Sequence, residues 1–365
     1  MTRCARGGLI SASMRVWLIS TCMRVWLIPT GTRAWLIPTC MRGSLLATGM
    51  LGVMGTVAAG QASESRTTLH VEPSSFAPVV IYETATERCM TFTRVNNPNA
   101  ESCYRLVHPE AVAFDYTRMM VSGLMVKPAP RRILLIGLGG GTLATTLATL
   151  VPDASIDSVE IDPAVVSMAT RYFGYRTSPM QRVHIADGRA FIIDAAEKHE
   201  RYDMVLLDAF GDDYIPVHMM TREFLGHVRG VLAPDGIVVA NTAGEGPLYA
   251  RETATYQAVF GTVLNFPARN RIIVASSDPL PDDDALRRQE VLWRARLAQV
   301  GIDSSVFFDR LQHLPANALR HDAAPAHATG SRGSCGRDAT SSPRVLTDAT
   351  IDQAMNQADP CAHLP

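Results

Sequence analysis

Apolar runs alternate with segments of helical periodicity between residues 131 and 276. The runs "RILLIGL", "SIDSVEI", "RVHIA", "YDMVLLDAF" and "GIVVANT" are strand-like, and segments such as "TLATTLATL" and "AVVSMATRYF" between them repeat apolar residues at helical spacing. Continuous apolar strands separated by helices are typical of a parallel sheet that helices cover on both faces. The pattern therefore predicts an α/β fold with a mostly parallel sheet.

The pattern changes on either side of this region. Before it, the short β-like runs "APVVIYET", "RCMTFTRV" and "SCYRLV", separated by turn residues such as "NNPN", predict a small antiparallel sheet. The stretch "PEAVAFDYTRMMVSGLMV" predicts a linking helix, and "DALRRQEVLWRARLAQV" predicts another helix after the α/β region. We thus expect a small β domain over 63–108, a linking helix within 109–130 and an α/β domain over 131–310.

The start of the chain has a different character. Residues 14–40 repeat one nine-residue unit, "MRVWLISTC", "MRVWLIPTG" and "TRAWLIPTC", which matches no known structural period and resembles duplicated coding sequence. We therefore expect residues 1–40 to lie outside the fold. Residues 41–62 begin with Met41, carry one positive charge and an apolar run, and resemble a secretory signal peptide with cleavage near Ala62. An uncleaved anchor is the alternative, although the apolar run is short for a membrane span.

Localisation depends on that segment. If it is used, the protein is exported or periplasmic, and if not, the protein is cytoplasmic.

Residues 311–365 are rich in Ala, Ser, Gly, Pro and His without periodicity, and predict a poorly ordered tail.

Composition narrows the range of partners. The formal net charge of −1 argues against a nucleic-acid or anionic-membrane surface. No CxxC or Cys/His cluster suggests zinc, so no metal is expected. Cys89 and Cys103 fall in neighbouring β-like runs. In an exported chain they can form a disulfide, and in a cytoplasmic chain two ordinary thiols are expected.

A glycine-rich loop follows the first strand of the α/β region. Gly137, Gly139 and Gly141 form GxGxG between a strand and a helix, where backbone N–H groups face a ligand. Thr142 stands where a dehydrogenase fingerprint requires glycine. The loop therefore indicates a nucleotide-like ligand without identifying it.

Acidic residues end the next two strands. Glu160 closes the second strand and can accept hydrogen bonds from both hydroxyls of a ribose. Asp187, followed by Gly188 in "ADGR", ends the third strand and can accept the exocyclic amine of an adenine. Either acid alone is also explained as a helix N-cap or a solvated strand end. As a set with the glycine loop, they predict an adenosine across the C-terminal edge of the sheet.

Several segments together resemble the spermidine synthase family of aminopropyltransferases, in its bacterial spermidine synthase-like branch. The resemblance covers roughly residues 80–276 and rests on "ILLIGLGGG", "VEIDPAVVSMATRYFG", "RVHIADGRAFI", "YDMVLLDAF", "IPVHMMTREF" and "VLAPDGIVVANT". It implies the class I S-adenosylmethionine-dependent methyltransferase fold, which is Rossmann-like, with a small N-terminal antiparallel β domain. The nucleoside motifs are shared with many methyltransferases, whereas "DYTRMM" and "LLDAF" are more particular to the synthases.

The resemblance assigns roles to individual residues. It implies that the glycine loop, Glu160 and Asp187 bind the adenosine of decarboxylated S-adenosylmethionine, which serves as co-substrate. It matches Asp208, at the end of the fourth strand, to the catalytic aspartate, and Tyr116 to a tyrosine of the substrate pocket. A carboxylate at Asp208 can orient an attacking amine and take its proton.

The chain departs from the family pattern at the amine end. Gly140 stands where the family's loop has an aspartate that holds the cofactor's amine, and Gly211 stands where a second acid helps to bind the diamine. Arg118 replaces a glutamate after the tyrosine, which places a cation near a pocket for cations. Asp212 can stand in for the missing acid of the substrate pocket, or it belongs to a solvated acidic loop.

Three functions from different classes therefore stay open. The first is aminopropyl transfer from decarboxylated S-adenosylmethionine to a small-molecule amine such as putrescine. The second is methyl transfer from intact S-adenosylmethionine, which the loss of the loop aspartate and the presence of Arg118 favour. The third is an exported protein that binds a nucleoside or polyamine without turnover. A homodimer also stays open, and no nucleic acid or stable membrane partner is expected.

Overall fold

The computed structural model describes residues 65–92, 100–209, 215–246, 248–316, 345–352 and 355. They belong to one compact unit that begins at Ala62. The repeats, the signal-like segment and Asp212 lie outside the described residues, so the predictions made for them stay predictions. No helix among the described residues is long and apolar enough to cross a membrane.

A four-stranded antiparallel sheet forms first. Its strands pair in the order β1-β2-β3-β4, with bounds β1 (Thr67–Glu72), β2 (Val79–Glu83), β3 (Glu87–Thr91) and β4 (Ser102–Arg105). The last three match the predicted β-like runs. Strand β1 was not among them because its side chains are mostly exposed and leave no apolar run to detect. The small antiparallel β domain is thus confirmed.

A disulfide joins the last two strands of this sheet. Cys89 on β3 lies directly opposite Cys103 on β4, and the two form a disulfide with their Cα atoms 4.1 Å apart. The sequence left the disulfide and two free thiols open, and the strand register is what brings the sulfur atoms together.

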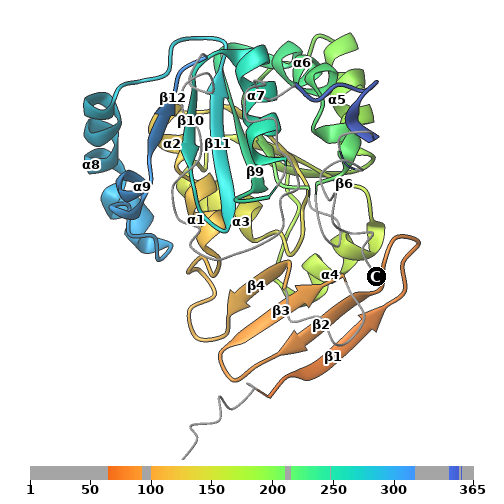
Figure 1. The fold of residues 1–365 in the computed structure, drawn as a ribbon. Helices are drawn as coiled ribbons and strands as arrows, with labels where there is room; N and C mark the ends of the chain where they lie inside the picture. Colours follow the sequence, from red (N-terminus) through yellow and green to blue (C-terminus); the bar gives the residue numbers. More distant parts are fainter. Residues whose placement is uncertain are drawn as a thin grey trace, which may run out of the picture. The chain divides into compact units, whose positions relative to one another are not determined.

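The second sheet carries the α/β domain (Figure 1). Within the described residues it has eight strands in the order β12-β10-β11-β9-β8-β5-β6-β7. The strands from β9 to β7 in this order pair in parallel, whereas β10, β11 and β12 add an antiparallel edge. The strand bounds are β5 (Arg132–Ile136), β6 (Ser155–Glu160), β7 (Gln181–Ile185), β8 (Tyr202–Leu207), β9 (Leu232–Ala243), β10 (Val263–Phe266), β11 (Asn270–Ser276) and β12 (Gln312–Leu314).

Helices cover both faces of this sheet, as the continuous apolar strands predict. Alternate residues of one strand point to opposite faces: Ile133 and Leu135 of β5 belong to one apolar core, and Leu134 and Ile136 to the other. The first core includes residues of α1 (Asp115–Met120), α2 (Gly123–Val126), α3 (Thr142–Leu150) and α8 (Asp283–Gln299). The second includes residues of α5 (Gly188–Glu197), α6 (Arg222–Gly230) and α7 (Tyr249–Phe260). The Rossmann-like fold class is confirmed.

Helix α4 (Pro163–Tyr172) connects the two sheets. Val165 and Met168 on this helix pack against Val79, Ile81 and Met90 of the small sheet. The same helix contributes Ala169 to the core beneath the large sheet. This shared packing holds the small sheet against the α/β domain and fixes its position over the strand ends.

The linking helix is shorter than predicted. It begins only at Asp115 and is divided into α1 (Asp115–Met120) and α2 (Gly123–Val126). The preceding backbone has partners outside a helix: the Val112 N–H donates to the carbonyl oxygen of Val300, and the Val112 carbonyl accepts from Arg118. Because these backbone groups are satisfied by tertiary contacts, helical spacing of apolar residues is not enough to extend the helix here.

The C-terminal part of the chain contributes more to the fold than its composition predicts. Gln312–Leu314 forms β12 at the edge of the large sheet, after the short α9 (Val306–Asp309). Residues 345–352 lie next to α5 and α6, where the dark blue segment is drawn in Figure 1. Leu346 is fully buried and packs with Met220 and Leu248. A few isolated apolar residues are enough for this docking, and they carry no periodicity to predict it.

Candidate active site

A cavity of about 1070 Å³ opens at the C-terminal edge of the parallel strands. Its lining comes from the glycine loop, from the ends of β6, β8 and β9, and from the β3–β4 side of the small sheet. Parallel strands that end at one edge of a doubly covered sheet form the usual crevice for a nucleotide-like ligand. The predicted site residues can therefore be compared directly with the cavity.

The glycine loop is held by the neighbouring strand ends. The Gly137 N–H donates to the carbonyl oxygen of Val159, and the Asp208 N–H donates to the carbonyl oxygen of Ile136. Gly137 has a φ of +92°, and a Cβ atom there would lie 2.3 Å from the carbonyl oxygen of Asp208. Only glycine fits this position, so the loop and the residue that closes β8 are built against each other.

Glu160 lies buried beneath the loop. Its two carboxylate oxygens accept backbone N–H groups of Leu138 and Asp162, each at 3.0 Å. Burial raises the pKa of the Glu160 carboxyl, and these backbone hydrogen bonds oppose the rise. Because each carboxylate oxygen can accept a second hydrogen bond, the group can still bind a hydroxyl that enters the cavity.

The Asp187 side chain makes two contacts. Its side chain caps α5 by accepting the Ala190 N–H at 2.8 Å, and its other oxygen lies 3.3 Å from Nε2 of His218. Both Asp187 and Gly188 also line the cavity. A Cβ atom at Gly188 would lie 2.4 Å from the Ile136 side chain, so glycine there lets α5 start close to β5.

Asp208 lies on the opposite side of the loop and is half-buried. Its Oδ1 accepts a hydrogen bond of 2.8 Å from Nδ2 of Asn241, at the end of β9. The Asn241 amide is oriented in turn by Nδ2 of Asn270, which donates to its Oδ1 at 3.2 Å. Burial raises the pKa of the Asp208 carboxyl to about 7, against the effect of the Asn241 hydrogen bond and with a smaller contribution from the negative charge of Glu101.

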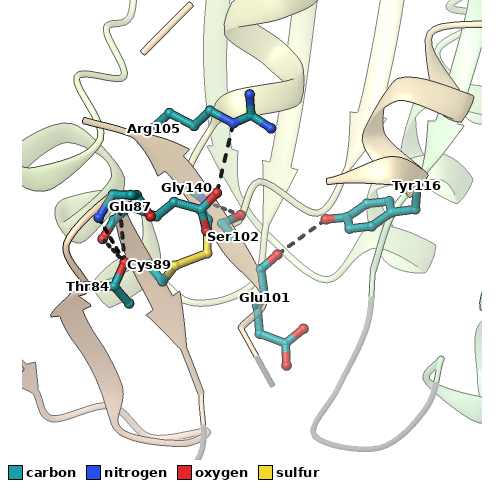
Figure 2. Close-up of a disulfide and its surroundings, with 10 residues drawn as sticks. Thr84, Glu87, Cys89, Glu101, Ser102, Arg105, Tyr116 and Gly140 are labelled. Atoms are coloured by element: carbon teal, nitrogen blue, oxygen red, sulfur yellow. Dashed lines mark hydrogen bonds and ion pairs between the residues drawn. A yellow bond between two sulfur atoms is a disulfide. The ribbon is translucent and has the colours of Figure 1, made fainter. Parts of the chain in front are cut away.

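Tyr116 and the end of the small sheet complete the cavity (Figure 2). The Tyr116 hydroxyl donates to the carbonyl oxygen of Glu101 at 3.3 Å. Next along β4, the Ser102 hydroxyl oxygen accepts the N–H of Gly140 in the glycine loop at 2.9 Å. Burial and the charge of Asp208 raise the pKa of the Tyr116 hydroxyl well above its usual value, which keeps it protonated as a donor.

Comparisons with known proteins identify the family of this chain. Residues 113–274 match the model of the spermine/spermidine synthase domain. The chain is 41% identical over 242 residues to the polyamine aminopropyltransferase of Vibrio vulnificus, which covers 65% of this chain and 81% of that protein. The chain belongs to the spermine/spermidine synthase family.

Two further similarities are to a solved structure and to a methyltransferase sequence. A probable spermidine synthase from Corynebacterium glutamicum superimposes with a TM-score of 0.55 at 20% identity, over 73% of this chain and 98% of that one, and shows the same fold. A human eEF1A lysine and N-terminal methyltransferase is 32% identical over 143 residues, which span 35% of this chain and 20% of that protein. The likeness to the methyltransferase is thus confined to a shorter region.

Most of the predicted site residues line one cavity, namely Tyr116, Gly137, Gly139, Glu160, Asp187, Gly188 and Asp208, whereas Gly141 and Arg118 are not among its described lining residues. The Arg118 guanidinium donates to the carbonyl oxygen of Val112 at 2.8 Å and to Asp115 at 2.8 Å, and Arg118 is absent from the described residues that line the cavity. In this synthase-family chain the Arg118 guanidinium therefore binds main-chain carbonyl oxygens and does not place a cation in the substrate pocket. Asp212 lies outside the described residues.

Three site residues were not predicted from the sequence of this synthase-family chain. Asn241 lies near the end of β9 and was detectable by the reasoning from strand ends that predicted Glu160 and Asp187. Asn270 starts β11, an antiparallel strand that was not predicted. Glu101 immediately precedes β4 in a segment with no chemical motif, and its N–H donates to the carbonyl oxygen of Met90 on β3, so the pairing of the small sheet brings it to the cavity.

One cluster near the cavity has the composition of a metal site. Atoms of Glu87, Cys89 and Cys103 that could bind a metal lie within 4.8 Å of one another. The two sulfur atoms are bonded to each other, and a disulfide offers no thiolate ligand. We therefore assign no metal to this cluster, and its two cysteines link β3 and β4 covalently.

Proposed function

We propose that the chain transfers an aminopropyl group from decarboxylated S-adenosylmethionine to a small amine such as putrescine. The proposal is supported by membership of the spermine/spermidine synthase family and by the cavity at the strand ends. The observation that carries it is the position of Asp208, which lies beside the nucleoside end of the same cavity with its carboxyl oriented by Asn241.

The nucleoside end of the cavity holds the co-substrate. Glu160 accepts the ribose hydroxyls while the backbone keeps its carboxylate in place. Asp187 binds the adenine amine from the start of α5, and Gly188 lets that helix start close to β5. Holding the co-substrate in one orientation lowers the barrier to a bimolecular displacement, because alignment is achieved on binding.

Asp208 serves the acceptor. The amine nitrogen attacks the aminopropyl carbon bonded to the sulfonium, a new C–N bond forms, and the C–S bond breaks with its electron pair left on sulfur. The leaving group is neutral 5′-methylthioadenosine. Oδ1 of Asp208 is engaged by Asn241, so Oδ2 is the oxygen that takes the amine proton. A pKa of about 7 suits a base that works near neutral pH.

Product release tests the proposal. Purified protein is incubated with decarboxylated S-adenosylmethionine and putrescine, and 5′-methylthioadenosine is measured. Asp208→Asn should lower turnover by a factor of about 10² or more while affinity for 5′-methylthioadenosine, measured by calorimetry, stays nearly unchanged. Asp153→Asn, at an exposed turn before β6, is the matched control and should keep wild-type turnover. No product with any polyamine would contradict aminopropyl transfer.

The other two functions have less support. The similarity to methyltransferases spans 20% of the human protein, against 81% of the aminopropyltransferase from Vibrio vulnificus. Arg118, which favoured a cofactor with a carboxylate, binds main-chain carbonyls instead. A binding protein without turnover does not require the oriented Asp208–Asn241 pair. Release of S-adenosylhomocysteine from intact cofactor would restore the methyltransferase.

Export and dimerisation are separate proposals. A disulfide persists mainly in oxidising compartments, so the Cys89–Cys103 bond supports export. Cell fractionation of the full chain tests localisation, and light scattering of the purified protein tests dimerisation.

A further inference from the structure

Residues 345–352 form a docked segment outside the family domain, which spans residues 113–274. The segment lies next to α5 and α6 (Figure 1). Leu346 is fully buried, and the Asp348 N–H donates to a carboxylate oxygen of Glu223 on α6 at 3.0 Å. The main chain of the segment is therefore held against the α/β domain, close to the start of α5.

The Asp348 side chain pairs with Arg189 in the first turn of α5. Two guanidinium nitrogens of Arg189 donate to the two carboxylate oxygens of Asp348, at 2.9 and 2.5 Å. A bidentate pair of this kind fixes the plane of the guanidinium as well as its position. The hydrogen bond from Arg189 lowers the pKa of the Asp348 carboxyl to about 2, so Asp348 is ionised at neutral pH.

The paired guanidinium lies close to Asp187, the residue proposed to bind the adenine amine. One Arg189 nitrogen also donates to the carbonyl oxygen of His218 at 2.7 Å, and Nε2 of the same histidine lies 3.3 Å from Asp187. The hydrogen bond to Asp348 raises the pKa of the Arg189 guanidinium. The negative charges of Glu223 and Asp187 add to this rise. The cation is thus within electrostatic reach of Asp187, but its N–H groups are directed to Asp348.

Asp187 needs acceptor capacity for its ligand. One of its oxygens accepts the Ala190 N–H and the other contacts His218, and an ionised carboxylate has about four acceptor positions. An arginine without its anionic partner is compensated by the next carboxylate within reach. A guanidinium binds a carboxylate more strongly than a neutral amine does, because both partners of the pair are charged. The adenine position on Asp187 therefore depends on where Arg189 is paired.

We infer that Asp348 is a positioning residue of the nucleoside site: it holds Arg189 away from Asp187 and so keeps that carboxylate available to the adenine amine. The inference rests on the proposed function, because it takes Asp187 as the adenine-binding residue. None of the described residues 345–352 lines the cavity. The segment thus acts on the co-substrate through Arg189 and without contact.

Calorimetry of the purified full chain with 5′-methylthioadenosine tests this inference. Asp348→Asn keeps the shape of the side chain but removes its charge, and should weaken binding about fivefold or more. The Asp348 side chain is 44% exposed, so the variant should fold, which urea unfolding checks. Asp352→Asn, at an exposed position of the same segment, is the matched control and should bind within about twofold of wild type.

The two halves of the ion pair should respond differently. Arg189→Gln removes the competing cation, keeps a neutral N–H donor, and should weaken binding less than Asp348→Asn does. Adding Arg189→Gln to Asp348→Asn should restore most of the lost affinity. A pair that only stabilises the fold gives another pattern, in which both single variants weaken binding alike and the double variant recovers nothing. That pattern, or an unchanged affinity in Asp348→Asn, would overturn the inference.

The inference and the proposed function fail in different ways. A wild-type protein that binds 5′-methylthioadenosine with the expected pattern among the variants, but releases none from decarboxylated S-adenosylmethionine with any amine, refutes the transferase and leaves the role of Asp348 standing. Normal product release with equal affinities in wild type and Asp348→Asn refutes the role of Asp348 alone. A wild-type protein that binds no 5′-methylthioadenosine contradicts both.

Discussion

The raised pKa of Asp208 predicts that this residue destabilises the ligand-free protein at neutral pH. Its carboxyl has an ordinary pKa of 3.8, and burial raises this to about 7. The folded chain therefore holds the proton more tightly than the unfolded chain. Stability should fall as pH rises through the window between these values and should be independent of this group above and below it. Asp208→Asn removes the titrating group while keeping an acceptor for Asn241.

The size of the effect follows from the shift. One pH unit corresponds to about 1.4 kcal/mol, so a rise of about three units gives an upper limit of about 4 kcal/mol. Roughly 2.5 kcal/mol of this develops between pH 5 and pH 8. Asp208 lies at an open cavity and is only half-buried, so water screens part of the penalty, and an effect of about 1–2.5 kcal/mol is expected.

Urea unfolding at pH 5 and pH 8 without ligand measures the effect. The unfolding free energy of Asp208→Asn minus that of wild type should increase by about 1–2.5 kcal/mol from pH 5 to pH 8. Asp153→Asn, at an exposed turn, should show no such increase. A difference that stays constant with pH, or falls, would refute the argument that burial raises the pKa of Asp208.

Three further predictions concern other parts of the molecule. Glu160→Gln removes a charged acceptor and should weaken 5′-methylthioadenosine binding by about 1.5–3 kcal/mol in calorimetry, and an unchanged affinity would contradict its role at the ribose. Reduction of Cys89–Cys103 should lower the unfolding free energy by about 3 kcal/mol, and titration of the unreduced, unfolded protein should find neither cysteine as a thiol. Leu346→Ala should cost about 2–5 kcal/mol because Leu346 is fully buried. A loss below about 0.5 kcal/mol would show that residues 345–352 do not dock in solution.

The sequence predicted the parts of the fold that repeat a simple period. Strands such as Arg132–Ile136 are buried on both faces and stand out as apolar runs, and the acids at their ends follow from a rule about parallel strands. Glu160 and Asp187 were predicted in this way, whereas Asp208 was matched through the family resemblance, and the structure places all three on one cavity.

The remaining features depend on contacts between distant residues. Arg118 was expected in the pocket because of its place in a motif, but nearby carbonyl oxygens bind its guanidinium. Glu101 reaches the cavity only through the register of β3 and β4. Leu346 enters the core from a segment without periodicity. Such positions are decided by tertiary packing, which no local pattern encodes.

The docked segment at 345–352 has a consequence for how the protein is made. Arg189, the second residue of α5, forms a bidentate pair with Asp348 at 2.9 and 2.5 Å, and the Leu346 carbonyl oxygen accepts the N–H of Arg222 at the start of α6. A ribosome completes both helices well over a hundred residues before it adds these partners. During that interval Met220 and Leu248 lack the leucine that covers them. The growing chain thus exposes the apolar side chains of Met220 and Leu248 until synthesis passes residue 346. An exposed apolar surface of this kind is one to which a chaperone can bind.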